Sequence, residues 1–281
     1  MLRRSFAQIP GIGAATEQRL WQDGFDSWEK LLAGLDTAPI GSADREIVRI
    51  HLEESLSALQ GGDVDFLRKS LGLREAWRAW EELRGSCLYL DIETDGGQHG
   101  SSVTIVGLYD GADFVALVKE RDLDELPERL AGCRMLVTFF GSGFDLPMLE
   151  KRFRGFSFPQ VHLDLCPTLR RLGLKGGLKS IERQLGIARG EETDGLSGWD
   201  AVKLWNAYYH LGDEAALERL IAYNREDVVN LERLAEYAVE RLRVDTMLGR
   251  LVDEPPERKS SRPWPPPSRR SRPAGQPEVS G

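Results

Sequence analysis

The stretch CLYLDIET at residues 87–94 decides the fold, because helical patterns precede it and strand patterns begin with it. Residues two apart in a strand point to the same face, so Asp91 and Glu93 project together while the apolar residues 88, 90 and 92 fill the other face. Two adjacent carboxylates repel each other and are poorly solvated near a buried strand, and a divalent cation resolves both problems. A strand that frays into solvent at Asp91 is the alternative, and the motif alone leaves both interpretations open.

The elements around this strand predict a mixed α/β sheet flanked by helices. Before it, residues 1–34 indicate a small helical unit, and two more helices are expected at 43–60 and 63–84. After it, an antiparallel meander is predicted from strands at 102–109 and 114–118. The remaining pattern predicts a helix near 123–132, a strand at 135–140, a helix at 145–154, a strand at 160–165, and helices at 178–185, 198–210 and 213–243.

A second acidic motif lies inside the last predicted helix. Tyr223 and Asp227 are four residues apart and share one helix face with an apolar stripe of leucines. A carboxylate within such a stripe is unfavourable unless it is paired or binds a metal. Asp227 at the edge of the stripe, or paired with an arginine, explains the motif equally well.

A third candidate, Asp145, follows the glycine-containing loop FFGSGF at residues 139–144. A strand is expected to enter this loop and a helix to leave it. Taken alone, Asp145 is better explained as the N-cap of that helix. Capping and metal binding are compatible, because the end of a strand is also where sites form.

The combination of the three motifs is more informative than any one of them. They occur in the order strand, strand-to-helix loop and late helix, which suits a site that holds two divalent cations roughly 4 Å apart at a phosphodiester. Oxygen ligands favour Mg²⁺ or Mn²⁺ over zinc. The sequence therefore predicts two such ions held by Asp91, Glu93, Asp145 and Asp227.

Composition and charge are compatible with this prediction. The chain has 281 residues, a formal charge of −8 and 41% hydrophobic residues. The segment 151–189 carries nine basic and two acidic residues, a local charge of +7, which favours a polyanionic partner. We see no apolar run long enough for a membrane helix and no signal peptide, so we expect no membrane association and a cytoplasmic location. Three widely separated cysteines predict neither a disulfide nor a zinc site.

Three segments resemble the motifs of the DEDD 3′–5′ exonucleases: LDIET (90–94), FGSGFDLP (140–147) and YNREDVVNL (223–231). The Tyr-x3-Asp spacing is similar to that of the tyrosine branch. The segments WRAWEELRGSCLYLDIETDG (77–96) and HLDLCPTLRRLGLKGGLKSIERQLGI (162–187) resemble bacterial YprB-like proteins of the ribonuclease-H-like superfamily. The resemblance covers roughly residues 65–245. In one departure, related proofreading domains often carry asparagine where this chain has Phe140.

The resemblance implies hydrolysis of a DNA or RNA strand from its 3′ end. Asp91 would then bridge the two metal ions, Glu93 and Asp227 would be further ligands, and Asp145 would contact a metal directly or through water. Tyr223 would orient the attacking water, because an ordinary tyrosine is a poor base at neutral pH. Substrate contacts are expected from Thr94, from Phe144 and from the basic run Arg170, Arg171, Lys175 and Lys179. A place in the core is the better explanation of Phe144 taken alone, and a solvated surface explains the basic run equally well.

The N-terminal segment IPGIG at residues 9–13 resembles a helix-hairpin-helix hairpin. The resemblance implies that Gly11 and Gly13 let the backbone approach a phosphate next to a helix N-terminus. Glu17 departs from the motif, which usually has alanine there, and a purely structural αα-hairpin is an equal alternative.

The expected organisation is therefore a helical N-terminal region (1–84), a ribonuclease-H-like exonuclease domain (85–245) and a disordered tail rich in proline, arginine and serine (253–281). A structure-specific endonuclease using the same metals, and a non-catalytic nucleic-acid-binding module on the same fold, are the alternatives to an exonuclease.

Overall fold

The computed structural model describes residues 1–97, 102–190, 193 and 195–247. The tail predicted at 253–281 lies outside these residues. The small helical unit expected at 1–34 is confirmed: it consists of a short 3-10 turn η1 (Leu2–Arg4) and the helices α1 (Ala14–Gln22) and α2 (Trp28–Ala33). The next predicted helix is α3 (Arg45–Gly61), which ends at Gly62 in the left-handed conformation.

The single helix predicted over 63–84 is wrong in its continuity. Helix α4 (Val64–Glu75) contains Gly72 with φ 56° and ψ −178°, which only glycine adopts easily, so the chain kinks there. The segment continues as the 3-10 turn η2 (Ala76–Ala79), the short helix α5 (Trp80–Leu83) and the turn η3 (Arg84–Ser86).

The sheet has five strands in the order β3-β2-β1-β4-β5. Strands β1 (Cys87–Thr94), β2 (Val103–Tyr109) and β3 (Phe114–Val118) form the predicted antiparallel meander. Strands β4 (Met135–Thr138) and β5 (Val161–Asp164) then add in parallel beside β1. The mixed sheet is thus confirmed, and its central strand is the one that carries Asp91 and Glu93.

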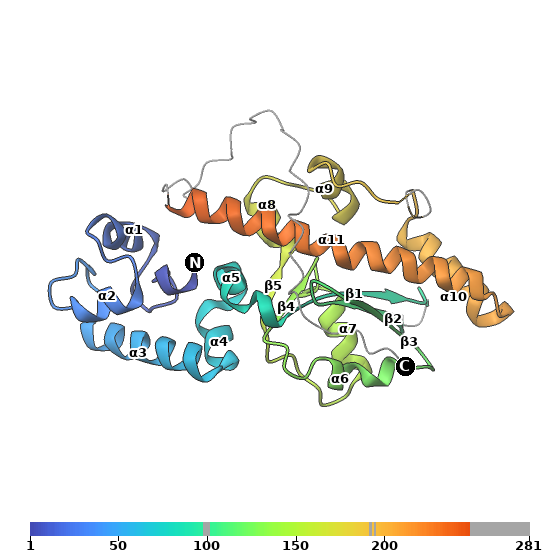
Figure 1. Cartoon of the computed structure of the whole chain (residues 1–281), viewed down its shortest axis with the longest axis horizontal. Helices are drawn as coiled ribbons and strands as arrows, with labels where there is room; N and C mark the ends of the chain where they lie inside the picture. The colour runs from blue at the N-terminus through green and yellow to red at the C-terminus, as the bar shows by residue number, and fades with distance from the viewer. Residues whose placement is uncertain (98–101, 191–192, 194, 248–281) are drawn as a thin grey trace, which may run out of the picture.

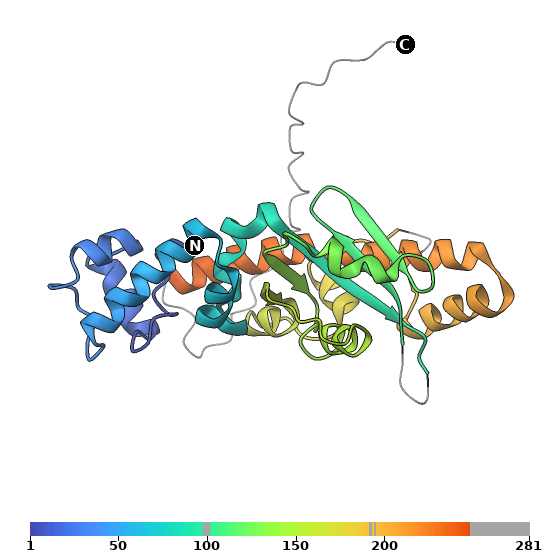
Figure 2. The same ribbon diagram turned by 90° about the horizontal axis from the view of Figure 1, so that it is seen from below.

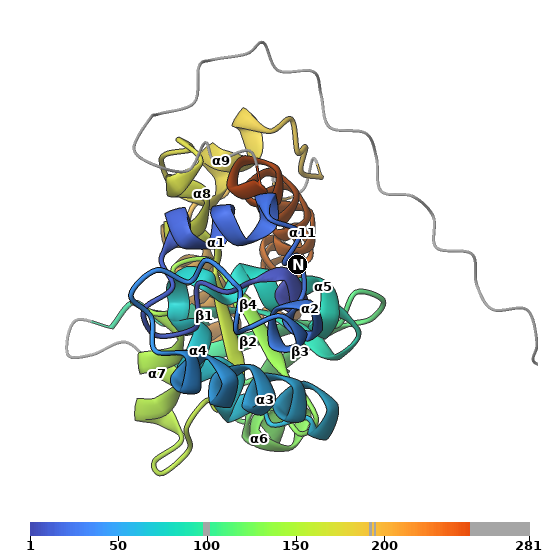
Figure 3. The same cartoon turned by 90° about the vertical axis from the view of Figure 1, so that its left-hand side faces the viewer.

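Helices cover both faces of this sheet (Figures 1 and 3). On one face lie α6 (Leu126–Arg129), preceded by the turn η4 (Leu123–Glu125), and α7 (Asp145–Arg152). Their leucines pack with Leu90, Ile92 and Leu136 of the sheet. The helix predicted near 123–132 is therefore shorter than expected.

The other face is covered by the long helix α11 (Glu214–Met247), with α8 (Leu165–Arg171), α9 (Leu178–Gln184) and α10 (Gly198–Leu211) around it. Here Cys87 and Tyr89 of β1 pack against apolar residues of α11. This arrangement confirms the predicted alternation of β1, and it places the odd-numbered Asp91 and Glu93 on the α11 side.

The buried apolar side chains of the N-terminal helices are continuous with those on the α11 side of the sheet. Trp28 and Leu52 belong to this cluster, as do Trp77 and Leu231 (Figure 2 shows the N-terminal helices beside the sheet). Among the described residues, no helix has both the length and the low polarity needed to cross a bilayer.

Candidate metal centre

Three carboxylates converge between the central strand and the long helix. Each of Asp91, Glu93 and Asp227 offers an oxygen, and these oxygens all lie within 4.8 Å of one another. The first two come from β1 and the third from α11, so residues 136 positions apart in the sequence meet in one group. Such a group of hard oxygen donors suits a divalent cation.

Asn224, which sequence reasoning missed, ties the helix to the strand. Its side chain is fully buried, and its Nδ2 donates a hydrogen bond to Asp91 Oδ2 at 3.0 Å. Gly107 lies opposite Asp91 in β2, and a Cβ there would overlap the Asn224 side chain. The signal in the sequence was an amide next to Tyr223, on the same helix face as Leu220 and Val228.

Asp145 lies close to this group but does not belong to it. It is the first residue of α7, only 3% exposed, and the N-cap position is occupied by Phe144, which makes no side-chain cap. The capping interpretation is therefore wrong. Burial, and after it the charge of Asp145, are the main causes that raise the pKa of Asp91 well above its usual value.

Burial raises the pKa of every carboxyl group at this centre, and repulsion from neighbouring carboxylates adds to it. Burial, followed by the charge of Asp227, raises the pKa of Glu93 to about 8. Burial raises the pKa of Asp145 to about 7, and it raises the pKa of Asp227 to about 6 against the opposing effect of Arg189. Acidic groups arranged in this way gain from a cation that neutralises them.

Arg189 is the positive charge nearest to Asp227. Its Nη2 donates to Asp227 Oδ1, so the pairing with an arginine that the sequence left open does occur. The same guanidinium is paired with the buried Glu182. In the sequence Arg189 was only one member of the basic segment 151–189, because nothing local marks its partner.

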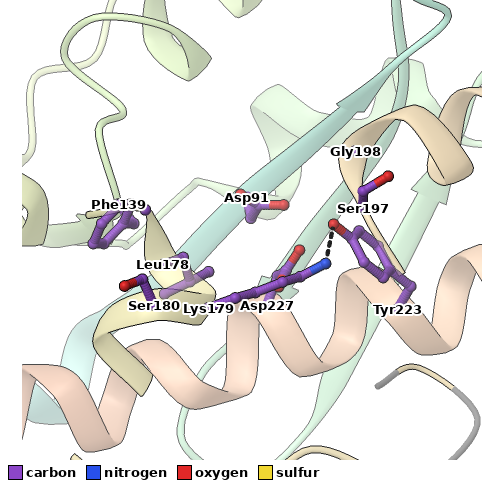
Figure 4. Close-up of a pocket in the computed structure, with 10 residues that line it drawn as sticks. Asp91, Phe139, Leu178, Lys179, Ser180, Ser197, Gly198, Tyr223 and Asp227 are labelled. Atoms are coloured by element: carbon purple, nitrogen blue, oxygen red, sulfur yellow. Dashed lines mark hydrogen bonds between the residues drawn. The ribbon is translucent and has the colours of Figure 1, made fainter. Parts of the chain in front are cut away.

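Tyr223 and Lys179 meet beside the carboxylates. Lys179 Nζ donates to the Tyr223 hydroxyl at 2.8 Å and lies 4.1 Å from the centre of the ring. Burial lowers the pKa of Lys179 and raises that of Tyr223 well above its usual value. Figure 4 shows Lys179 extending toward Tyr223, with Asp91 and Asp227 at the same cavity.

Two adjacent cavities open over the carboxylates. The first, of about 390 Å³, is lined by Asp91 and Asp227 together with Phe139, Lys179, Ser197 and Tyr223. The second, of about 250 Å³, shares both aspartates and adds Glu93, Thr94 and Phe144. The predicted contact residues Thr94, Phe144 and Lys179 are thus at the centre.

The other predicted contact residues lie elsewhere. Arg171 donates to the backbone carbonyl of Arg74 at 2.6 Å, and burial lowers its pKa, so its guanidinium packs against the N-terminal region. Arg170 and Lys175 are exposed and do not line either cavity. Of the four basic residues, Lys179 thus lies at the metal centre, Arg170 and Lys175 lie on the surface, and Arg171 makes a structural contact.

The N-terminal hairpin has the local geometry expected from its glycines. Gly11 has φ 83° and packs closely on Ala43, while Gly13 is exposed and is the N-cap of α1. Glu17 is buried; it accepts from the amides of Phe6 and Ala7 and pairs with Arg78. The departure from alanine at this position therefore has a structural cause.

A mixed sheet with a carboxylate group on its central strand suits a hydrolase that binds divalent cations, and comparison with known proteins identifies the superfamily. Residues 88–239 match the family RNase_H_2, described as the RNase_H superfamily, and the chain belongs to this superfamily. This membership supports a nuclease fold that acts on nucleic acid.

Among solved structures, the chain is similar to the family B DNA polymerase from the hyperthermophilic archaeon Pyrobaculum calidifontis. The identity is 17% and the TM-score is 0.45, and the match covers 58% of this chain and 28% of the polymerase chain. None of the curated proteins matches the chain.

Proposed function

We propose that this chain is a metal-dependent nuclease that hydrolyses a DNA or RNA strand from its 3′ end with two Mg²⁺ or Mn²⁺ ions. The observation that carries the proposal is the group formed by Asp91, Glu93 and Asp227, whose oxygens lie within 4.8 Å of one another. Superfamily membership supports the nuclease class, and the acidic group supports dependence on a metal.

The side chains present fit hard divalent cations. All donors are carboxylate oxygens, and their pKa values are raised mainly by burial, so their charged forms would be stabilised by a bound cation. Asp91 would contact both ions, Glu93 and Asp227 would be further ligands, and Asp145 would contact an ion directly or through water. Two bound ions would stabilise the attacking and leaving oxygens of a phosphodiester.

The contact with Lys179 suits Tyr223 to orient the attacking water. Because Lys179 donates to the Tyr223 oxygen, the hydroxyl proton of the tyrosine is free to be donated elsewhere. The raised pKa of Tyr223 keeps this proton in place at neutral pH, so the tyrosine positions water rather than deprotonating it. The positive charge of Lys179 would also attract a phosphate.

Thr94 and Phe144 line the cavity beside the carboxylates, where a terminal nucleotide would lie. Phe144 is 42% exposed, and an exposed ring can stack on a base. Along the same strand, we propose phosphate contacts from Arg170 and Lys175, and from the exposed backbone at Gly11 and Gly13. Arg171 would contribute only if it left Arg74.

Single strands labelled at the 3′ or the 5′ end test the proposal. The purified protein is incubated with each strand in Mg²⁺, Mn²⁺ or EDTA, as DNA and as RNA. We expect metal-dependent laddering that starts at the 3′ end. A single internal cut at a junction would instead indicate an endonuclease, and metal-independent or absent cleavage would contradict the proposal.

The variant Asp91→Asn tests the site assignment. We expect it to reduce cleavage at least about a hundredfold while the protein stays folded, because the central ligand is lost but the side-chain volume is kept. Glu128→Gln, which neutralises an exposed carboxylate on α6, is the matched control and is expected to cleave like the original protein. Full activity in Asp91→Asn would refute the assignment.

A further inference from the structure

Arg189 lies between two buried carboxylates, Asp227 of the metal centre and Glu182 outside it. Its Nη2 donates to Asp227 Oδ1 at the metal centre. The same nitrogen donates to Glu182 Oε1 at 2.8 Å, and Nε donates to Glu182 Oε2 at 2.7 Å. The side chains of Arg189 and Glu182 are only 5% and 1% exposed. A two-point contact of this kind fixes the plane of the guanidinium.

The segment that carries Arg189 is itself fastened to α11. Asn230 donates to Glu182 Oε1 at 2.9 Å, so Glu182 is held from the same helix as Asp227. Glu226 accepts from the amide of Gly190 at 2.7 Å and from the Thr193 hydroxyl. Arg189 is therefore held in place independently of Asp227, and it restrains the Asp227 carboxylate.

We propose that Arg189 is a positioning residue that reserves one oxygen of Asp227 and thereby makes the metal centre prefer Mg²⁺ or Mn²⁺ over Ca²⁺. This inference rests on the proposed metal site. With Oδ1 engaged by Arg189, Asp227 offers a cation one free oxygen. Ca²⁺ takes about six to eight oxygens and often both from one carboxylate, whereas Mg²⁺ takes six at shorter distances. A carboxylate limited to one oxygen therefore disfavours Ca²⁺.

The positive charge of Arg189 also affects cation binding, and this effect must be distinguished from that of the reserved oxygen. A guanidinium near the site repels all divalent cations about equally, so removing it would strengthen the binding of Ca²⁺ and Mn²⁺ alike. The loss of the reserved oxygen changes the ratio of the two affinities. The quantity to measure is therefore the ratio of dissociation constants, not either constant alone.

The test is calorimetric titration of the metal-free full chain with CaCl₂ and with MnCl₂. The variant is Glu182→Gln/Arg189→Gln, because replacing Arg189 alone would leave Glu182 buried without its partner and endanger folding. A second variant, Arg189→Lys, keeps the charge but loses the two-point contact. We expect both variants to shift the affinity ratio toward Ca²⁺ by roughly tenfold, the size seen when residues behind metal ligands are replaced.

The matched control is Glu17→Gln/Arg78→Gln. It replaces another buried two-point arginine–glutamate pair, with side chains 1% and 4% exposed, in the N-terminal region. It should change thermal stability to a similar extent and leave the affinity ratio unchanged. An unchanged ratio in the Glu182/Arg189 variants, or an equal shift in the control, would overturn the proposal.

Binding and cleavage are measured separately, so the two proposals can fail separately. A shifted ratio in a protein that cleaves no strand would support the role of Arg189 and contradict the nuclease activity. Cleavage that depends on Mn²⁺, together with an unchanged ratio, would contradict only the role of Arg189.

Discussion

Because Gly107 has no side chain, helix α11 packs closely on strand β2 beside Asp91. The glycine pairs with Asp91 across β1 and β2, and the space above it is filled by Asn224 and Val228 from α11. This close approach lets the Asn224 amide reach Asp91 Oδ2 at 3.0 Å. The position of Asp227, one helical turn further on, follows from the same approach.

Gly107→Ala should therefore destabilise the protein and disturb the centre. The new Cβ would overlap Asn224 Oδ1 and lie 2.7 Å from Val228 Cγ2, so α11 must shift. We expect a loss of about 2 kcal/mol in the free energy of unfolding, measured with urea, and weaker Mn²⁺ binding. Gly85→Ala is the control, because no atom lies within 4 Å of its Cβ. Equal stability of the two variants would contradict this account.

At the scale of elements, Asp164 connects the end of β5 with the loop that leads into α7. It caps α8 through the amide of Cys166, and it accepts from the amides of Phe140 and Ser142 and from the Ser142 hydroxyl at 2.5 Å. These bonds hold Phe140 at φ 66°, a conformation that asparagine adopts more readily. An asparagine at position 140 would fit the same backbone.

Asp164→Ala should release this loop and with it Asp145. The variant leaves several donors without their acceptor, so we expect a loss of about 3 kcal/mol in the free energy of unfolding, together with reduced cleavage. Asp110→Ala is the control; Asp110 accepts from two amides in the exposed turn between β2 and β3, and its loss should be less than about 1 kcal/mol. A smaller effect at Asp164 than at Asp110 would contradict this role.

At the scale of the whole molecule, the apolar core stabilises the folded chain, whereas the buried carboxyl groups of the metal centre destabilise it when they are charged. The apolar core runs without a break from the N-terminal helices to the α11 side of the sheet. Into this structure the fold places four carboxyl groups with raised pKa values. When no cation is bound, the folded chain holds protons that the unfolded chain has already lost above about pH 4.

The metal-free protein should therefore lose stability as the pH rises from about 4 to about 8. In the folded state, the pKa values of Asp227, Asp145 and Glu93 are about 6, 7 and 8, above their ordinary values. Proton binding to these groups therefore stabilises the folded state at low pH, and this stabilisation is lost as the pH rises from about 4 to about 8. We expect the melting temperature in EDTA to be lower at pH 8 than at pH 5, and the opposite order would contradict the prediction.

Mn²⁺ should reverse this trend, because a cation binds the deprotonated groups. At a hundred times its dissociation constant it would add ~2.7 kcal/mol, and it should stabilise more at pH 8 than at pH 5. The variant Asp91→Asn should show a smaller response to Mn²⁺. Equal stabilisation at both pH values would contradict a site built from these carboxylates.

The sequence predicted the elements that a periodic pattern of apolar residues or a family motif specifies by itself. The alternation of residues 87–94 predicted the central strand, and the order of the elements predicted the mixed sheet. The break at Gly72 and the early end of β4 at Thr138 were missed, because they depend on a single backbone angle and on contacts made by the following loop.

By itself, the sequence determined which face of β1 carries Asp91 and Glu93, and that Tyr223 and Asp227 share one face of a helix. Both follow from local geometry, because the spacing along a strand or a helix dictates direction. Only the tertiary structure decided that Asn224 holds Asp91, that Arg189 pairs with Asp227 and that Lys179 reaches Tyr223. These contacts join residues 38 to 133 positions apart, and at such separations the packing of whole elements, not local spacing, determines which side chains meet.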